Sequence, residues 1–317
     1  MGKMLIALQS HDGDLPDFFS HEIQSFPPSL SDGGEIHLPP NKSHILFDIL
    51  AQDQHPFPAY DTKILDGAAV IHMLKTGAAK TFAEYSEKVF IPHLKSHLAT
   101  TERLDIVWDQ YLPNSLKAHT REKRGRARGI CRKLAAATKL PGNWQDFLRD
   151  DKNKHKLFEF LSNTVSCHEY PEEKLVIITA GEGVKSNKDF NMSACSHEEA
   201  DTRIMIHLLN AIELGSRKVN IRTVDSDIII NLIGKFFEIK DMIEDVCVTF
   251  GTGKNLVHYS IRGIYNELGD SKSKAFIFFH AFTGCDTVCF SWKRQENCTE
   301  HLESIQECNQ SFLSNYP

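Results

Sequence analysis

The sequence contains no apolar run that approaches the about 20 residues needed by a membrane-spanning helix. It also contains no paired Cys-x-x-Cys motif among its eight cysteines, and no secretory signal opens it. The spacings of the cysteines and histidines near the C-terminus, such as Cys285, Cys289 and His301, fit no common zinc pattern. We therefore expect a soluble, reduced protein inside the cell, nuclear or cytoplasmic, with no membrane partner.

An excess of positive charge is absent too. The formal net charge is −6, which excludes a protein that binds nucleic acid through its overall charge. A catalytic cluster of carboxylates would itself make the total negative, so a nuclease is not excluded. The charge is uneven, because the segment Lys117–Arg128 is strongly basic. This segment is either a solvated helix face or a surface for a phosphate backbone, and we favour the second.

The chain of 317 residues has 41% hydrophobic and 25% charged residues, which are ordinary globular values. No internal repeat is evident. Turn-forming clusters of Pro, Asp and Gly predict an irregular arm, or the remnant of an upstream region, over residues 1–60. We expect the core to span residues 61–290 and a C-terminal tail, which could be truncated, to span residues 291–317.

Apolar runs alternate with helical patterns in the predicted core. Strands are expected at 63–65, 104–108, 174–179 and 218–224, and helices through Ala68, Ile71 and Leu74 and over 199–214. The segment 130–170, with Ala135–Ala137 and Trp144–Leu161, is also expected to be helical. Strands that alternate with helices favour an α/β fold of three layers, with a mainly parallel central sheet between two layers of helices.

Acidic residues follow these strands. Asp66, Asp109 and Asp225 come at strand ends, Asp227 follows two residues later, and Glu199 and Asp201 open the helix before the last strand. Asp286 follows an apolar segment. Because ligands of open α/β sheets bind at the carboxyl ends of the strands, these carboxylates are expected to gather at one edge. Such a cluster needs cations to stay ionised, and oxygen ligands favour two Mg²⁺ or Mn²⁺ ions, the arrangement that hydrolyses phosphodiesters.

Each acidic residue also has an ordinary structural explanation. A single Asp after a strand is usually a helix N-cap, which applies to Asp66 and Asp109. Acidic residues at a helix start, such as Glu199 and Asp201, suit the helix dipole. Metal-dependent chemistry is favoured because all of these acidic residues, although they come from separate segments, are predicted to lie at the same edge of the sheet.

The acidic motifs resemble those of PIN-like nucleases of the flap-endonuclease and XPG branch. The resemblance runs from Lys63 to Thr287 and rests on five motifs in order: Ile64–Ala68, Ile106–Asp109, Glu199–Thr202, Val224–Asp227 and Gly284–Asp286. The sequences of Ser196–Arg203 and His280–Thr287 are also similar to segments of uncharacterised animal PIN-like proteins associated with mobile elements.

The resemblance implies a residue set. Asp66, Asp109, Glu199 and Asp201 would hold a first metal ion, and Asp225, Asp227 and Asp286 would complete a second. Lys117 and Arg124 would contact the scissile phosphate, with Arg121 as a competitor for that role. The basic segment as a whole would bind DNA or RNA; its charged residues are Lys117, Arg121, Lys123, Arg124, Arg126 and Arg128.

The sequence departs from this family after Asp286, because no helix-hairpin-helix module that grips duplex DNA is evident before Pro317. Two readings therefore stay open: a metal-dependent nuclease acting on DNA or RNA, and an inactive PIN-like module, derived from a mobile element, that binds nucleic acid or protein. A metal-dependent phosphatase of another α/β class is a third, but Asp225-Ser-Asp227-Ile228 lacks the final residue of its motif. The oligomeric state cannot be predicted from the sequence.

Overall fold

The computed structural model describes residues 31–32, 35–36, 59–111 and 134–284. Nearly all of them belong to one compact unit, Leu50–Phe276. Of the second unit, formed by residues 1–49 and 277–317, the structure describes the short strands β1 (Ser31–Asp32) and β2 (Glu35–Ile36) and the end of a helix. No described helix has both the length and the apolar character needed to cross a membrane. The predicted limits of the arm and tail remain predictions.

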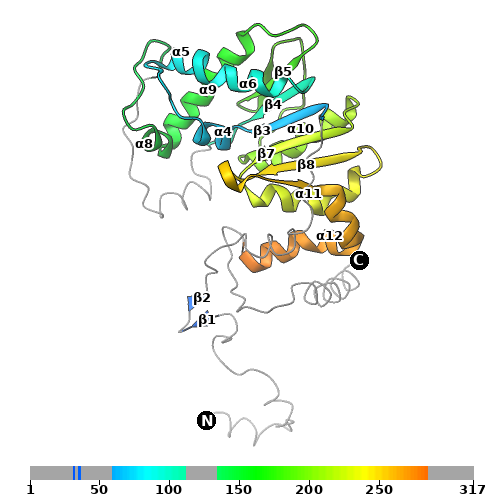
Figure 1. Cartoon of the computed structure of the whole chain (residues 1–317). Helices are drawn as coiled ribbons and strands as arrows, with labels where there is room; N and C mark the ends of the chain where they lie inside the picture. Colours follow the sequence, from blue (N-terminus) through cyan, green and yellow to red (C-terminus); the bar gives the residue numbers. More distant parts are fainter. Residues whose placement is uncertain (1–30, 33–34, 37–58, 112–133, 285–317) are drawn as a thin grey trace, which may run out of the picture. The chain divides into compact units, whose positions relative to one another are not determined.

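A sheet of seven strands forms the centre of the larger unit, in the order β6-β5-β4-β3-β7-β8-β9 (Figure 1). The five inner strands are parallel: β3 (Thr62–Asp66), β4 (Arg103–Val107), β5 (Leu175–Ala180), β7 (Lys218–Thr223) and β8 (Asp245–Phe250). The edge strands β6 (Gly183–Ser186) and β9 (Val257–Ser260) are antiparallel to their neighbours. The predicted mainly parallel sheet is therefore confirmed.

Helices cover both faces of the sheet and complete the three layers (Figure 1). One face carries α4 (Gly67–Met73), α5 (Phe82–Tyr85), η1 (Ser86–Phe90), α6 (Ile91–Leu98), α8 (Trp144–Arg149) and α9 (Asp151–Cys167). The other carries α10 (Ala200–Glu213) and its neighbour α11 (Ser226–Ile239). The helix α12 (Ile261–Gly284) is interrupted at Gly269, whose φ of 76° suits glycine.

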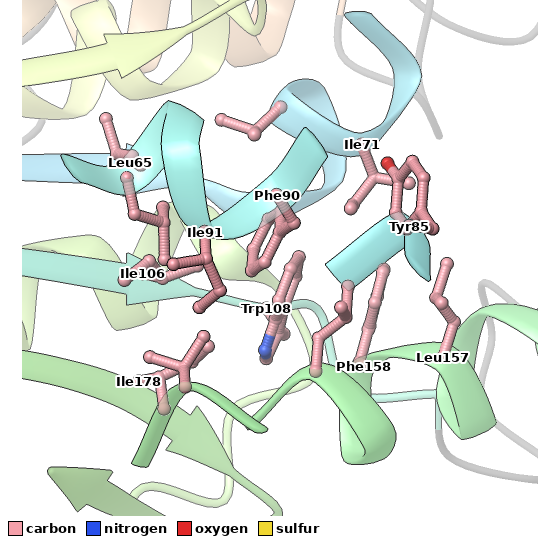
Figure 2. Packing of buried hydrophobic residues seen from close by; sticks show 14 of the residues in the cluster. Leu65, Ile71, Tyr85, Phe90, Ile91, Ile106, Trp108, Leu157, Phe158 and Ile178 are labelled. Atoms are coloured by element: carbon pink, nitrogen blue, oxygen red, sulfur yellow. The ribbon is translucent and has the colours of Figure 1, made fainter. Parts of the chain in front are cut away.

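The main core lies between the sheet and the α4–α9 layer (Figure 2). Leu65 and Ile106 alternate with residues that face the other layer, as a pleated strand requires. Trp108, directly after β4, stacks on Phe158 of α9 with ring centroids 4.2 Å apart. This contact fixes the chain where β4 ends, and so fixes the start of the loop that carries Asp109.

The order of the strands sets the position of the site. The chain leaves β3 towards β4 on one side, and later returns to β7 on the other side of β3. Because crossovers between parallel strands are right-handed, this reversal puts helices on opposite faces and opens a crevice at the carboxyl ends of the central strands. Asp66 ends β3, and Asp109 and Asp225 each lie two residues beyond β4 and β7.

Two features differ from the expectation. Ala135–Ala137 is not helical: Ala83 and Phe82 at the start of α5 donate backbone hydrogen bonds to Ala136 O and Thr138 O, so the segment runs beside α5. The strands β6, β8 and β9 were not predicted. The segment Gly251–Lys254 connects β8 to β9 and includes the start of the short turn η2 (Gly253–Asn255).

Candidate functional site

A cavity of about 330 Å³ opens where β3, β4 and β7 end. We call it the acidic cavity, because the ionisable groups that line it among the described residues are six carboxylates and one histidine. These are Asp66, His72, Asp109, Glu198, Glu199, Asp201 and Asp225. Five of the seven predicted metal ligands therefore line one cavity, although they come from four separate segments of the chain.

Asp66 is the most buried of these carboxylates, with 7% of the residue exposed. Its Oδ1 accepts a 3.1 Å hydrogen bond from the backbone N–H of Ala69 and so caps α4. Its Oδ2 accepts a 3.0 Å hydrogen bond from the hydroxyl of Thr223 at the end of β7. Asp66 thus caps α4 and also lines the cavity. Its structural role as a helix cap does not exclude a role in metal binding.

Asp109 connects the end of β4 to the start of α10. Its Oδ1 accepts a 3.0 Å hydrogen bond from the backbone N–H of Ala200, and the backbone N–H of Gln110 donates to Glu198 O at 2.7 Å. Glu199 is the N-cap residue of α10, yet its own side chain forms no capping hydrogen bond. The cap is supplied by Asp109 instead, which brings the second and third acidic motifs together.

Asp225 is exposed at the N-terminus of α11, and its Oδ1 accepts a 3.0 Å hydrogen bond from the backbone N–H of Asp227. Asp227 lies in the first turn of α11 and is not among the residues that line the acidic cavity. Its role as a metal ligand remains a prediction.

Burial and neighbouring charges act on Asp66 in the same direction. The pKa of Asp66 is raised from 3.8 to about 7, mainly by desolvation and also by the nearby carboxylates of Asp109 and Asp225. The hydrogen bonds from Ala69 and Thr223 partly oppose this shift in pKa. A carboxylate with such surroundings favours either a proton or a cation at neutral pH.

The donor set fits a hard divalent cation, because carboxylate oxygens are the ligands that Mg²⁺ and Mn²⁺ prefer. Within residues 59–111 and 134–284, however, no three His, Cys, Asp or Glu side chains are close enough to form a ready metal cage. Mg²⁺ usually binds through only one or two carboxylates and keeps several waters or substrate phosphates. The cavity therefore has the right oxygen donors without a closed protein cage.

Several predicted residues lie outside the described part of the chain. They are Asp286, the two expected phosphate contacts Lys117 and Arg124, and the remaining basic residues Arg121, Lys123, Arg126 and Arg128. Their predicted roles stay predictions.

The sequence did not point to Thr223, Gln110 or His72. Thr223 is fully buried, and its hydroxyl also accepts a 3.0 Å hydrogen bond from the backbone N–H of Asp225. Gln110 and His72 line the acidic cavity. Of these three residues, only Gln110 could have been found from the sequence, because it directly follows Asp109.

Comparisons with known proteins give little further information. No protein-family model matches this sequence, and no curated protein matches it. Among solved structures, the chain is similar to the catalytic core of Rad2 in complex with a DNA substrate, at 15% identity and a TM-score of 0.44. That match covers 85% of this chain and 68% of the other. A TM-score at this level carries no conclusion about function.

Proposed function

We propose that this protein is a metal-dependent nuclease with a PIN-like core, which hydrolyses phosphodiester bonds of DNA or RNA at the acidic cavity. The observation that supports the proposal is the gathering of Asp66, Asp109 and Asp225 around one cavity at the carboxyl ends of β3, β4 and β7, with Glu199 and Asp201 beside them. The pKa of Asp66 supports it as well, because its carboxyl is costly to ionise without a cation.

Asp66, Asp109, Glu199, Asp201 and Asp225 would hold the cations, with Asp227 and Asp286 as further predicted ligands. Bound Mg²⁺ or Mn²⁺ would activate water and stabilise charge on the leaving oxygen. The chain's own part is to fix the carboxylates, through the Ala69, Ala200 and Asp227 backbone N–H groups, and to keep the deepest one away from bulk water.

The test is cleavage of flap, single-stranded and duplex DNA, and of the matching RNA, with Mn²⁺ or Mg²⁺. Asp225→Asn removes a charge but keeps the oxygen that caps α11, so the fold should persist. We expect at least about a 100-fold loss of kcat in this variant. Asp241→Asn makes the same charge change at an exposed position outside the acidic cavity and should cleave like the wild type. Equal activity of the Asp225 variant and the wild type would refute the mechanism.

The inactive-module alternative predicts a different result. A silent PIN-like domain would bind nucleic acid or protein but would cleave none of these substrates with either metal. No feature of the described residues favours that alternative, because every predicted carboxylate that the structure describes is intact as Asp or Glu.

A further inference from the structure

A second cavity, of about 340 Å³, adjoins the acidic cavity and shares Asp109 and Gln110 with it. We call it the Arg203 pocket. Its ionisable lining groups are of mixed sign, unlike the mostly acidic lining of the first cavity: three are basic, His155, Lys185 and Arg203, and two are acidic, Asp109 and Glu159. The change from a carboxylate-lined space to one with three basic groups occurs across Asp109.

Arg203 is the unusual member of this lining. It lies on α10, only 3% of the residue is exposed, and its Nη2 donates a 2.7 Å hydrogen bond to the neutral carbonyl of Gly181. Its buried Nε has no hydrogen-bond partner within the described part of the chain. A guanidinium stays charged at every pH at which proteins are stable, so a buried donor without a partner is costly. A bound anion would supply the missing acceptor.

A second polar atom without a partner lies on the shared wall. Gln110 Oε1 is buried and has no hydrogen-bond partner among the residues that the structure describes. Because an amide can present either its oxygen or its nitrogen, Gln110 could accept from a ligand or donate to one. Two side chains with an unsatisfied polar atom therefore belong to the lining of the Arg203 pocket, and one of them also lines the acidic cavity.

The mouth of the pocket carries the other two basic residues. Lys185 of β6 is exposed, and its Nζ donates to Asn163 Oδ1 on α9. His155 is exposed two turns earlier on α9, with Glu159 between them. The inner wall is rigid, because Trp108 Nε1 donates to Ser162 Oγ at 3.0 Å and its ring stacks on Phe158. A small anion that enters the pocket would therefore meet a wall held in place by these contacts, with Arg203 in its lining.

We infer that the Arg203 pocket binds a backbone phosphate of the nucleic acid, next to the phosphodiester held at the acidic cavity. This inference rests on the proposed function, because it requires a nucleic-acid strand that passes from the acidic cavity to the Arg203 pocket. Guanidinium groups suit phosphate because their fork of donors matches two of its oxygens. Arg203 would hold the phosphate, and Lys185 would contribute charge at the mouth. The strand is thereby positioned by groups that carry no sequence information.

Binding of a fluorescent single-stranded oligonucleotide in EDTA tests this separately from cleavage. We expect Arg203→Gln to weaken binding about tenfold and to reduce the slope of log affinity against log salt by about 0.7, the value for one lost phosphate contact. Lys185→Gln should weaken binding about threefold; because Lys185 is exposed, this variant decides the matter if Arg203→Gln does not fold. Arg217→Gln, an exposed control at the opposite end of the sheet, should bind like the wild type.

An unchanged affinity and salt slope in both pocket variants would overturn the inference. So would equal protection of the pocket by inorganic phosphate and by the oligonucleotide in a thermal unfolding experiment, since this would indicate a site for free phosphate. Failure of the proposed nuclease function has a different signature: no Mn²⁺-dependent cleavage, or cleavage that survives Asp225→Asn.

Discussion

The hydroxyl of Thr223 lies 3.0 Å from Asp66 Oδ2, although 157 residues separate them in the chain. The same hydroxyl accepts the backbone N–H of Asp225 at 3.0 Å. One buried side chain therefore connects the carboxylate at the end of β3 to the acidic segment that follows β7. This arrangement holds two parts of the acidic cavity in register.

Thr223→Val tests this connection, since valine has nearly the same shape but cannot form either hydrogen bond. It would leave the Asp225 N–H without its acceptor and Asp66 without a donor, so we expect the free energy of unfolding to fall by about 1–3 kcal/mol. Thr223→Ser keeps the hydroxyl and should lose less. Urea unfolding of the three proteins measures the difference. A valine variant as stable as the wild type would mean that the hydroxyl does not matter.

Asp66→Asn tests the electrostatics of the cavity. With a pKa of about 7 in the folded state and 3.8 ordinarily, Asp66 keeps a proton between pH 4 and 7 that the unfolded chain releases. The stability of the metal-free protein should therefore fall as pH rises through this range, at most by roughly 1.4 kcal/mol per unit from this residue. Asparagine keeps the α4 cap and does not titrate.

Urea unfolding in EDTA at pH 5 and pH 8 makes the comparison. The Asn variant should gain stability relative to the wild type as pH rises, and Asp241→Asn should show no such trend. If the difference between Asp66→Asn and the wild type is the same at both pH values, the assigned pKa is wrong.

Gly67→Ala tests how closely the sheet edge is packed. A Cβ at Gly67 would lie 2.1 Å from Trp108 Cε3, and Trp108 is held by Phe158 and by the 2.8 Å hydrogen bond from its backbone N–H to Thr179 Oγ1. Although alanine normally favours helices, we expect a loss of about 1–3 kcal/mol from overpacking. Gly142→Ala meets no atom within 4 Å and serves as the control. Thermal unfolding distinguishes the two, and equal melting temperatures would contradict the packing described.

Asp105→Asn tests a buried charge network that lies under α10 rather than at the cavity. Asp105 is fully buried, accepts two hydrogen bonds from Arg103 at 2.8 and 2.7 Å, and lies 2.7 Å from His207 Nδ1. Burial opposes the charge, but hydrogen bonds from Arg103 and His207 outweigh it and lower the pKa of Asp105.

Removing this carboxylate charge leaves Arg103 buried without its counter-charge, so we expect a loss of about 3–5 kcal/mol. In the wild type the contribution is present above the ordinary pKa of the carboxyl and is lost as pH falls through the depressed value. Urea unfolding at pH 7 gives the magnitude. A variant within about 0.5 kcal/mol of the wild type, the usual range for surface changes, would show that the network contributes little.

Much of the fold was predictable because its inner strands are apolar runs between helical patterns, as in Lys174–Thr179 and Lys218–Val224. The edge strands β6 and β9 were not, because each has only four residues and no run of buried apolar side chains. The strand β8 carries a readable signal in Val246 and Val248 and was missed. At the site, the aspartates at strand ends could be predicted from the sequence. Thr223 and Arg203 could not, because they act through contacts with residues far away in the sequence.

The central claim is that the acidic cavity binds divalent cations through carboxylates from separate strand ends. Its most direct test is an anomalous difference map from crystals of the wild-type protein grown with Mn²⁺ at pH 8, where Asp66 is ionised. We predict at least one peak inside the cavity, within direct coordination distance of carboxylate oxygens of Asp66, Asp109 or Asp225. Mn²⁺ peaks at other surface sites only, with none in the cavity, would contradict the claim.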